Sequence, residues 1–447
     1  MRHKASRFRL ICYLLTLNCI LVPLVIRYWS CWHFIENGAL SLQQKKFMLQ
    51  KIPVGGKHVE RLHHRKACKR KKNIVFLKTH KTGSSTITNI LNRYGEARNL
   101  NFVLPNIGSN RLDWPWFFKN TSFYSLNGTE PNILCNHARF NKQPMTDLMP
   151  NDTVYVTILR NPISQFESSF SYMTFDKILG MKKSEDTLTE FFKDPEKVLV
   201  NYVLTQDLRI NSDRLKLIQN GMFYDLGLES KDFKNNKEIY KKLEELDHQF
   251  HLVMMMEYFD ESIVLLKRLL CWELDDFVYF RLKNRVESWR RHISKPLQEK
   301  ITKWSQADVI LYNHFNKTFW NILKNIDQDF WHEVEMLKAK NTFMRNMCIR
   351  YDKRENSFDS PDSAETKTIH IRHDIPFSVR KMCKRMTWDE IKYLKHLREL
   401  HIEKASGKQT KREGVTFTKT LYESFSWMAQ KVYDGYHVVQ HIHDEKS

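Results

Sequence analysis

Glycine and proline are scarce in this chain of 447 residues, which contains only 13 and 12 of them. Collagen-like repeats and long flexible linkers are therefore excluded, and no internal repeat is visible. The eight cysteines include no C-x-x-C pair, which argues against a zinc ribbon or a thioredoxin-like redox site. The phosphate-binding pattern G-x-x-x-x-G-K-[ST] is also missing, which argues against a P-loop kinase.

The composition is otherwise that of an ordinary globular protein, with 42% hydrophobic and 28% charged residues. Such a chain is long enough to bury a core that needs no metal or disulfide for its stability. Basic residues outnumber acidic ones by 72 to 51, which gives a formal net charge of +21. This charge predicts an anionic partner: nucleic acid, an acidic membrane surface, or a phosphorylated or sulfated small molecule.

Residues 10–26 form the longest uncharged apolar stretch of the chain. Their number lies at the lower limit for a membrane-spanning helix, and basic residues precede them. A cleaved signal peptide is the alternative, but bulky residues rather than small ones follow the stretch. We therefore expect an uncleaved signal-anchor at 10–26, with residues 1–9 in the cytosol and the rest of the chain in the lumen.

Several features fit a lumenal chain. Six cysteines follow the predicted span, and an even number permits disulfides in an oxidising compartment. Cys348 and Cys383 flank a polar stretch that a disulfide between them would close, although the sequence does not fix the pairing. Residues 27–72 are interpreted as a basic stem, because residues from about 41 to 72 are rich in Lys and Arg and contain one acidic residue, Glu60. Four N-x-[ST] sequons are candidate glycosylation sites: Asn120, Asn127, Asn151 and Asn316.

Short apolar runs that precede a polar turn and a helical pattern recur along the chain. The runs cover residues 73–78, 154–159 and 250–256, and the helical patterns that follow include residues 87–94, 162–170 and 262–270. Alternating strands and helices predict an α/β fold with a central parallel sheet flanked by helices. We expect this domain to span residues 73–403, and the tail at 404–447 shows no feature that assigns it.

The first turn, at residues 79–86, is rich in Thr and Ser and leads into a helix. Backbone N–H groups and the helix dipole make such a junction a ready anion site, and Lys81 adds a full charge. A purely structural turn is the alternative. After the second strand come Arg160 and, eight residues on, Ser168, which are suited to a phosphate at the strand's end. The two turns together predict a ligand with phosphate-like groups at both ends.

These two segments, LKTHKTGSST at 77–86 and ILRNPISQFESSF at 158–170, resemble the signature segments of sulfotransferases. More closely, the chain resembles the Golgi galactose 3-O-sulfotransferase family. The resemblance extends from residue 73 to about residue 403. Four other segments also match the family: CNHARFN at 135–141, MPNDTVYVTILRNP at 149–162, EYFDESIVLLKRLLCWELDD at 257–276 and YNHFNKTFW at 312–320.

The resemblance implies a P-loop-like sulfotransferase fold that uses 3′-phosphoadenosine 5′-phosphosulfate as co-substrate. Lys81 matches the lysine that contacts the bridging oxygen, and Arg160 and Ser168 match the pair that holds the 3′-phosphate. His137 falls where related enzymes carry a catalytic base, whereas His80 resembles a loop-packing residue. Some relatives have Ala in place of Gly83, an exchange that we expect to be harmless. The predicted 5′-phosphosulfate loop consists of Lys81, Thr82, Gly83, Ser84, Ser85 and Thr86.

The resemblance predicts transfer of a sulfuryl group to the 3-hydroxyl of a terminal galactose, with His137 as base and Lys81 at the leaving oxygen. A sulfuryl group carries one negative charge, so a lysine and N–H donors suffice and we expect no metal. The expected acceptor is a galactosylceramide-type glycolipid, with galactose-terminated glycoprotein glycans as the alternative. A non-catalytic lumenal glycan-binding protein is the alternative of another class. We expect a single-pass Golgi membrane protein and no nucleic-acid partner.

Overall fold

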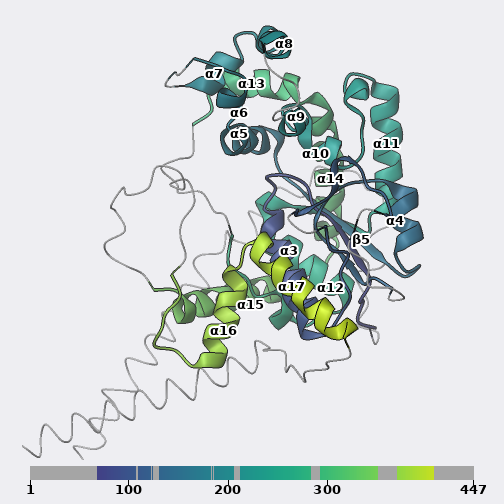
Figure 1. Cartoon of the computed structure of the whole chain (residues 1–447), viewed down its shortest axis with the longest axis vertical. Coiled ribbons are helices and arrows are strands. Elements are labelled where there is room, and N and C mark those ends of the chain that lie inside the picture. The colour runs from purple at the N-terminus through teal and green to yellow at the C-terminus, as the bar shows by residue number, and fades with distance from the viewer. Residues whose placement is uncertain are drawn as a thin grey trace, which may run out of the picture. The chain divides into compact units, whose positions relative to one another are not determined.

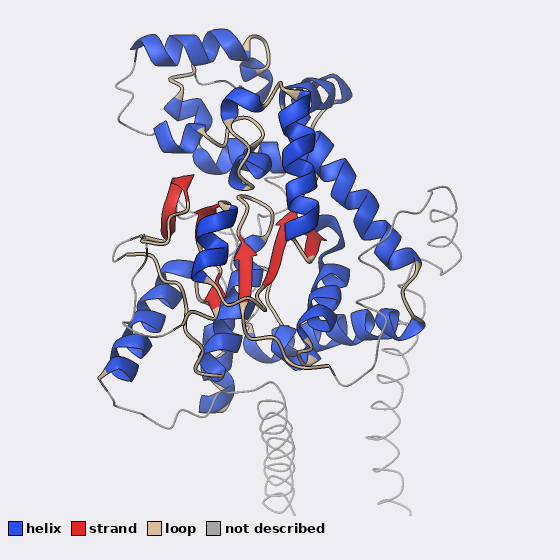
Figure 2. Ribbon diagram, turned by 90° about the vertical axis from the view of Figure 1, so that its right-hand side faces the viewer, coloured by secondary structure: helices blue, strands red, loops and turns tan. Residues whose placement is uncertain are grey.

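A computed structural model of the chain describes residues 68–106, 109–121, 123, 130–182, 184, 186–205, 212–282, 292–350 and 370–406. Within them, a central parallel sheet has helices on both of its sides (Figure 2). The α/β fold with a flanked parallel sheet is therefore confirmed.

Four parallel strands form the central sheet in the order β3-β1-β5-β6. Ile74 of β1 lies opposite Val154 of β5, and Leu159 of β5 lies opposite Met255 of β6. Every side chain of these four strands is buried, as expected for parallel strands that are covered on both faces. The strands are β1 (Ile74–Leu77), β3 (Ile133–Leu134), β5 (Val154–Leu159) and β6 (Leu252–Met255).

A second, two-stranded parallel sheet pairs β2 (Arg111–Phe117) with β4 (His137–Arg139). The register places Arg111 opposite His137 and shifts twice along the pair. The sequence did not predict β2, because Pro115 interrupts it and proline is rare inside strands. This small sheet matters for the site because it positions His137.

Helix α3 follows β1 because its apolar residues recur at helical spacing. Ile87, Ile90, Leu91 and Tyr94 are all buried against the core. The longer helices that complete the fold are α3 (Ser84–Ala97), α5 (Pro162–Met173), α8 (Pro195–Thr205), α11 (Asn236–Gln249), α12 (Phe259–Leu270), α13 (Lys295–Trp304), α14 (Gln306–Lys324), α15 (Gln328–Cys348), α16 (Phe377–Thr387) and α17 (Glu390–Ala405).

The carboxyl ends of the strands point toward a group of helices at the top of Figures 1 and 2. Helix α5 packs against α13 and α14 there, and α10 packs against α14. The short helices of this group are α6 (Phe175–Ile178), α7 (Thr187–Phe191), α9 (Ser212–Leu215) and α10 (Gly221–Asp225). In open α/β sheets ligands bind outside the carboxyl ends of the strands, so this edge is where a site is expected.

The last two described helices, α16 and α17, pack against α3 (Figure 1). Glu96 near the end of α3 anchors them: its carboxylate accepts hydrogen bonds from Tyr393 at 2.6 Å and from Arg385 at 2.9 Å. A second contact joins the start of α17 to the end of β1, where Lys78 and Glu390 form a buried ion pair. The carboxyl-terminal helices thus brace the helix that follows the first turn.

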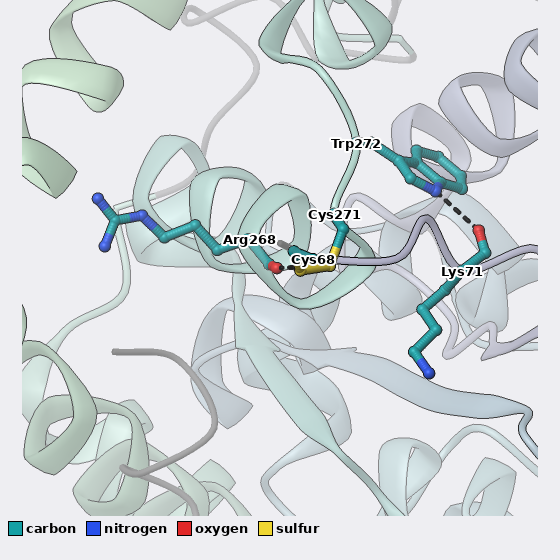
Figure 3. The surroundings of a disulfide bond; sticks show 5 residues. All are labelled: Cys68, Lys71, Arg268, Cys271 and Trp272. Atoms are coloured by element: carbon teal, nitrogen blue, oxygen red, sulfur yellow. Dashed lines mark hydrogen bonds between the residues drawn. A yellow bond between two sulfur atoms is a disulfide. The ribbon is translucent and has the colours of Figure 1, made fainter. Parts of the chain in front are cut away.

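Two disulfides are present among the described residues. One joins Cys348 to Cys383 and confirms the pairing that the sequence indicated. The other, Cys68–Cys271, ties residues before β1 to the end of α12, where Trp272 also donates to the carbonyl of Lys71 (Figure 3). Residues 68–72, which belong to the predicted basic stem, are therefore attached to the folded part of the chain.

No helix within the described ranges is long and apolar enough to cross a membrane. The predicted signal-anchor at residues 10–26 lies outside these ranges.

Candidate active site

The turn between β1 and α3 is shaped by its own hydroxyl groups. Thr82 and Ser84 both donate to the carbonyl oxygen of Thr79, at 3.1 and 2.7 Å, and Thr79 donates to the carbonyl of Ile158 on β5. The hydroxyl hydrogens of Thr82 and Ser84 are therefore used inside the turn. What these residues offer to an anion is their backbone N–H groups.

Those N–H groups are open at the start of α3. Within the described residues, no acceptor is found for the N–H groups of residues 82–85, and no side chain caps the helix. A helix of this length carries partial positive charge at its amino end. Four unsatisfied donors at that end form a cradle for an anion.

Gly83 is required by the backbone of this turn. Its φ is +77°, in the left-handed region, and a Cβ placed there would lie 2.4 Å from Sδ of Met256. A side chain would therefore be strained by its backbone conformation and would displace Met256. The expectation that alanine is harmless at this position is wrong in this chain.

Lys81 is the positively charged residue of the turn, and its side chain packs against α5. Its ammonium lies 3.5 Å from the centre of the Tyr172 ring, a cation–π contact. Helix α5 also touches the turn through Gln165, which donates to the carbonyl of His80 at 3.1 Å. The side chains of Gln165, Ser168 and Tyr172 follow the i, i+3 and i+7 spacing of one helix face.

Arg160 connects the second turn to the first. One of its guanidinium nitrogens donates to the carbonyl oxygen of Lys81 at 3.0 Å. Ser168, eight residues further on, is 8% exposed and lies within α5. The structure therefore brings Lys81 and Arg160 to one place at the carboxyl edge of the sheet, which is where the sequence predicted them.

His137 and His80 lie together. Their rings stack with centroids 4.1 Å apart and planes inclined by 17°. His80 is 7% exposed, and its Nδ1 contacts the carboxylate of Asp225 at 2.8 Å. Trp114 contacts the same group, since its ring centroid lies 4.6 Å from that of His80 and its Nε1 donates to Asp225 at 2.8 Å.

A second buried carboxylate supports this cluster from α14. Asp308 is 1% exposed and accepts hydrogen bonds from the backbone N–H groups of Met222 and Phe223, at 3.2 and 2.8 Å. The pKa of Asp308 is raised to about 7, mainly by burial and also by the nearby charge of Asp225, while the two N–H donors oppose the rise. The hydrogen bonds fix α10, the helix that ends in Asp225.

The predicted glycosylation sites occupy different surroundings. Asn120 and Asn151 are exposed, whereas Asn316 lies half-buried within α14. Asn127 lies outside the described residues. Glycosylation at these positions stays a prediction.

Backbone donors at the start of α3, the adjoining Lys81 and Arg160 from the next turn form a candidate anion site at the edge of an α/β sheet. A family model described as galactose-3-O-sulfotransferase matches residues 3–401. The chain belongs to the galactose-3-O-sulfotransferase family. The resemblance noted from the signature segments is thereby confirmed.

Individual relatives agree with this assignment. Human galactosylceramide sulfotransferase is 37% identical over 343 residues, which are 74% of this chain and 79% of the relative. Mouse galactose-3-O-sulfotransferase 2 is 35% identical over 344 residues, 73% of this chain and 85% of the relative. Bovine galactose-3-O-sulfotransferase 3 is 34% identical over 321 residues, 71% of this chain and 69% of the relative. The chain is therefore an enzyme of this family.

Three residues of this galactose-3-O-sulfotransferase site were not found from the sequence. Gln165 and Tyr172 share the helix face of Ser168, so helical spacing from Ser168 was a usable signal for both. No local sequence pattern marked Asp225 as a site residue. It lies in a helix of five residues, more than 140 positions from His80 in the chain.

Proposed function

We propose that this enzyme transfers a sulfuryl group from 3′-phosphoadenosine 5′-phosphosulfate to the 3-hydroxyl of a terminal galactose. Membership of a sulfotransferase family implies that donor. The observation that carries the proposal is the open amino end of α3, where the N–H groups of residues 82–85 adjoin Lys81. An alternative in which the chain only binds glycans is not supported, because the relatives are named as enzymes.

The residues present fit the two charged ends of such a nucleotide. Lys81 and the N–H groups of Thr82, Gly83, Ser84, Ser85 and Thr86, the predicted 5′ loop, are suited to the 5′-phosphosulfate, although the N–H of Thr86 already bonds to Gly83. Arg160 and Ser168 are suited to the 3′-phosphate. The nucleotide supplies the sulfuryl group. Lys81 stabilises the negative charge that develops on the leaving oxygen, the role that positioned cations have in such sites.

His137 is proposed as the base that accepts the proton of the galactose 3-hydroxyl. An imidazole titrates close to neutral pH, which suits this task. His80 is the competitor, because it is stacked on His137 and precedes Lys81.

Substitution distinguishes the two histidines. We expect His137→Ala to lower turnover by about 10²- to 10⁴-fold, the usual contribution of a general base, while adenosine 3′,5′-bisphosphate still binds. Turnover is measured with ³⁵S-labelled donor and binding by calorimetry. Full activity of His137→Ala together with an inactive His80→Ala would assign the base to His80 instead.

The proposed acceptor is a galactosylceramide-type glycolipid. The segment at 257–276, which resembles the glycolipid enzymes, includes α12. Most apolar side chains of this helix lie in the core. Buried side chains of this kind serve the core, so the resemblance of this segment does not support a glycolipid acceptor. The proposed acceptor is supported instead by the relatives that are named for galactosylceramide. Glycoprotein glycans with terminal galactose remain the alternative acceptor.

An acceptor panel tests the reaction and the acceptor together. The full-length chain is incubated with radiolabelled donor and either galactosylceramide or N-acetyllactosamine. We expect a higher kcat/KM for galactosylceramide, and a preference for N-acetyllactosamine would favour the glycan alternative. No labelled product with either acceptor, combined with no binding of the bisphosphate, would overturn the proposed function.

We also propose that the enzyme is a single-pass Golgi membrane protein whose catalytic domain is lumenal. The support is the apolar stretch at 10–26 with basic residues before it, together with the sequons. The experiment is protease protection of microsomes that contain the expressed chain. Digestion of the catalytic domain in intact vesicles would contradict this topology.

A further inference from the structure

Asp225 is a fully buried carboxylate that contacts His80, the residue whose ring stacks on the proposed base. It is the last residue of α10, and its exposed fraction is 0%. Its Oδ2 accepts hydrogen bonds from the backbone N–H and from Nδ1 of His80, both at 2.8 Å. Its Oδ1 accepts from Nε1 of Trp114, also at 2.8 Å. The carboxylate thus holds both the backbone and the side chain of the residue that precedes Lys81.

These contacts determine which nitrogen of His80 carries a hydrogen. A carboxylate only accepts hydrogen bonds, so Nδ1 of His80 is the donor. In the neutral imidazole Nε2 then has no hydrogen and is an acceptor. Asp225 therefore sets the tautomer of His80 as well as the orientation of its ring.

His80 passes this constraint to His137 through the stacked rings. A proton that arrives on His137 creates an imidazolium beside His80, and the carboxylate of Asp225 lies behind it. In a buried site an anion at this position lowers the free energy of the cation. The arrangement resembles other catalytic sites in which a carboxylate orients an imidazole without itself reacting.

Asp225 is itself fixed from another helix. The backbone N–H of Asp308 donates to Oδ1 of Asn220 at 3.0 Å, while the carboxylate of Asp308 accepts from the first turn of α10. These reciprocal hydrogen bonds hold the beginning of α10 to the beginning of α14. Two buried carboxylates in one small region are costly to fold, which is the pattern expected where a site requires them.

We propose that Asp225 is a positioning residue for sulfuryl transfer, which acts through His80 by fixing its tautomer and the ring on which His137 stacks. This inference rests on the proposed function. It adds a residue that acts without touching either substrate.

The experiment compares the full-length wild type with Asp225→Asn, which keeps the shape and removes the charge. We expect kcat to fall by about 10²- to 10⁴-fold, the usual contribution of the general base that this carboxylate would help to position. The affinity for adenosine 3′,5′-bisphosphate and the KM for galactosylceramide should change by less than about threefold. The rising limb of the kcat–pH profile should move to lower pH, because loss of the anion disfavours the imidazolium.

The other charged groups on the elements around His80 and His137 are the same in the wild type and in Asp225→Asn. They are Lys81, Arg111, Arg139, Arg160 and Asp308. The matched control is Asp247→Asn on α11, where another carboxylate contacts a histidine, His314, at 3.1 Å. That pair is half-exposed and outside the site, so its loss should leave kcat and the pH profile unchanged.

A double-mutant cycle with His80→Ala tests whether Asp225 acts through His80. In that background Asp225→Asn should cost less than about threefold in kcat. Additive losses, an unshifted pH profile, or kcat within threefold of the wild type would each overturn the proposal. So would loss of bisphosphate binding in both Asp225→Asn and the smaller Asp225→Ser, since Asp225 would then be a determinant of the fold. Turnover of the wild type in the same assay tests the proposed function separately.

Discussion

The turn after β1 and the turn after β5 lie at the same edge of the sheet and satisfy their backbone amides in opposite ways. In the first, the N–H groups of residues 82–85 have no acceptor among the described residues. In the second, Asn161 donates its N–H to Glu257 at 2.7 Å, and its side chain accepts from Ile163 and Ser164. Pro162 has no N–H to offer.

This difference predicts how each turn would bind an anion. The first presents backbone donors and a helix dipole, so it suits a group that is gripped from several directions. In the second, the described backbone donors build the turn, so a ligand would be bound there through the side chains of Arg160 and Ser168. If the proposed function holds, similar strand–turn–helix units would bind the two ends of one nucleotide by different means.

The largest expected effect is on the first turn. Lys81→Ala should lower kcat by at least about 10²- to 10³-fold, the loss typical for one charge-stabilising donor. Lys142→Ala on the exposed surface of α4 (Lys142–Leu148) is the control and should be silent. Rates are measured with radiolabelled donor at saturating acceptor. Wild-type turnover of Lys81→Ala would show that the backbone cradle alone carries the leaving-group role.

Gly83→Ala tests the geometry of the same turn. Positive φ costs about 1–2 kcal/mol for a residue with a Cβ, and overpacking against Met256 adds about 1–3 kcal/mol. We expect a lower free energy of unfolding by denaturant and weaker binding of the bisphosphate.

Two matched variants separate the backbone contribution from the steric contribution to the loss of stability in Gly83→Ala. Gly180 has a φ of +62°, and the Cβ that alanine adds there would meet no atom within 4 Å, so Gly180→Ala measures the backbone term alone. Adding Met256→Ala to Gly83→Ala should recover the steric part and leave the backbone part. Equal costs at Gly83 and Gly180 would show that Met256 moves aside freely.

The sequence predicted the units of this fold well because their patterns are local. Strand β1 is an uninterrupted apolar run, and β5 is apolar or aromatic except at Thr157. The helix after the first turn shows its spacing in Ile87, Ile90 and Tyr94. The position of Arg160 beside Lys81 followed from parallel topology, since carboxyl ends of neighbouring strands meet at one edge.

The remaining features depend on contacts between distant residues. The steric part of the cost of a side chain at Gly83 comes from Met256, which approaches from the end of another strand. The packing of α10 against α14 places Asp225 beside His80. Strand β3 has two residues, too few for any period to show. Such features are set by tertiary packing, which a single sequence does not display.

Arg160→Gln sharpens the contrast between backbone and side-chain binding. A hydrogen bond from a cation to an anion contributes about 1.5–3 kcal/mol, so affinity for adenosine 3′,5′-bisphosphate should fall about 10- to 100-fold. Affinity for adenosine 5′-phosphate, which lacks the 3′ group, should fall far less. Arg160→Lys keeps the charge and should retain an intermediate affinity. Equal losses for both nucleotides would mean that Arg160 acts mainly by bracing Lys81 through its carbonyl.

The smallest effect is expected at Asn161, whose side chain caps α5. Asn161→Ala should lower the free energy of unfolding by about 1 kcal/mol, whereas Asn161→Asp keeps the capping oxygen and should be nearly neutral. Bisphosphate affinity should change by less than about threefold in both, because the capped N–H groups are not offered to the ligand. Denaturant unfolding and calorimetry measure the two quantities on the same samples. Affinity that fell strongly in Asn161→Ala, with stability unchanged, would show that the second turn also binds through its backbone, and the contrast between the two turns would be lost.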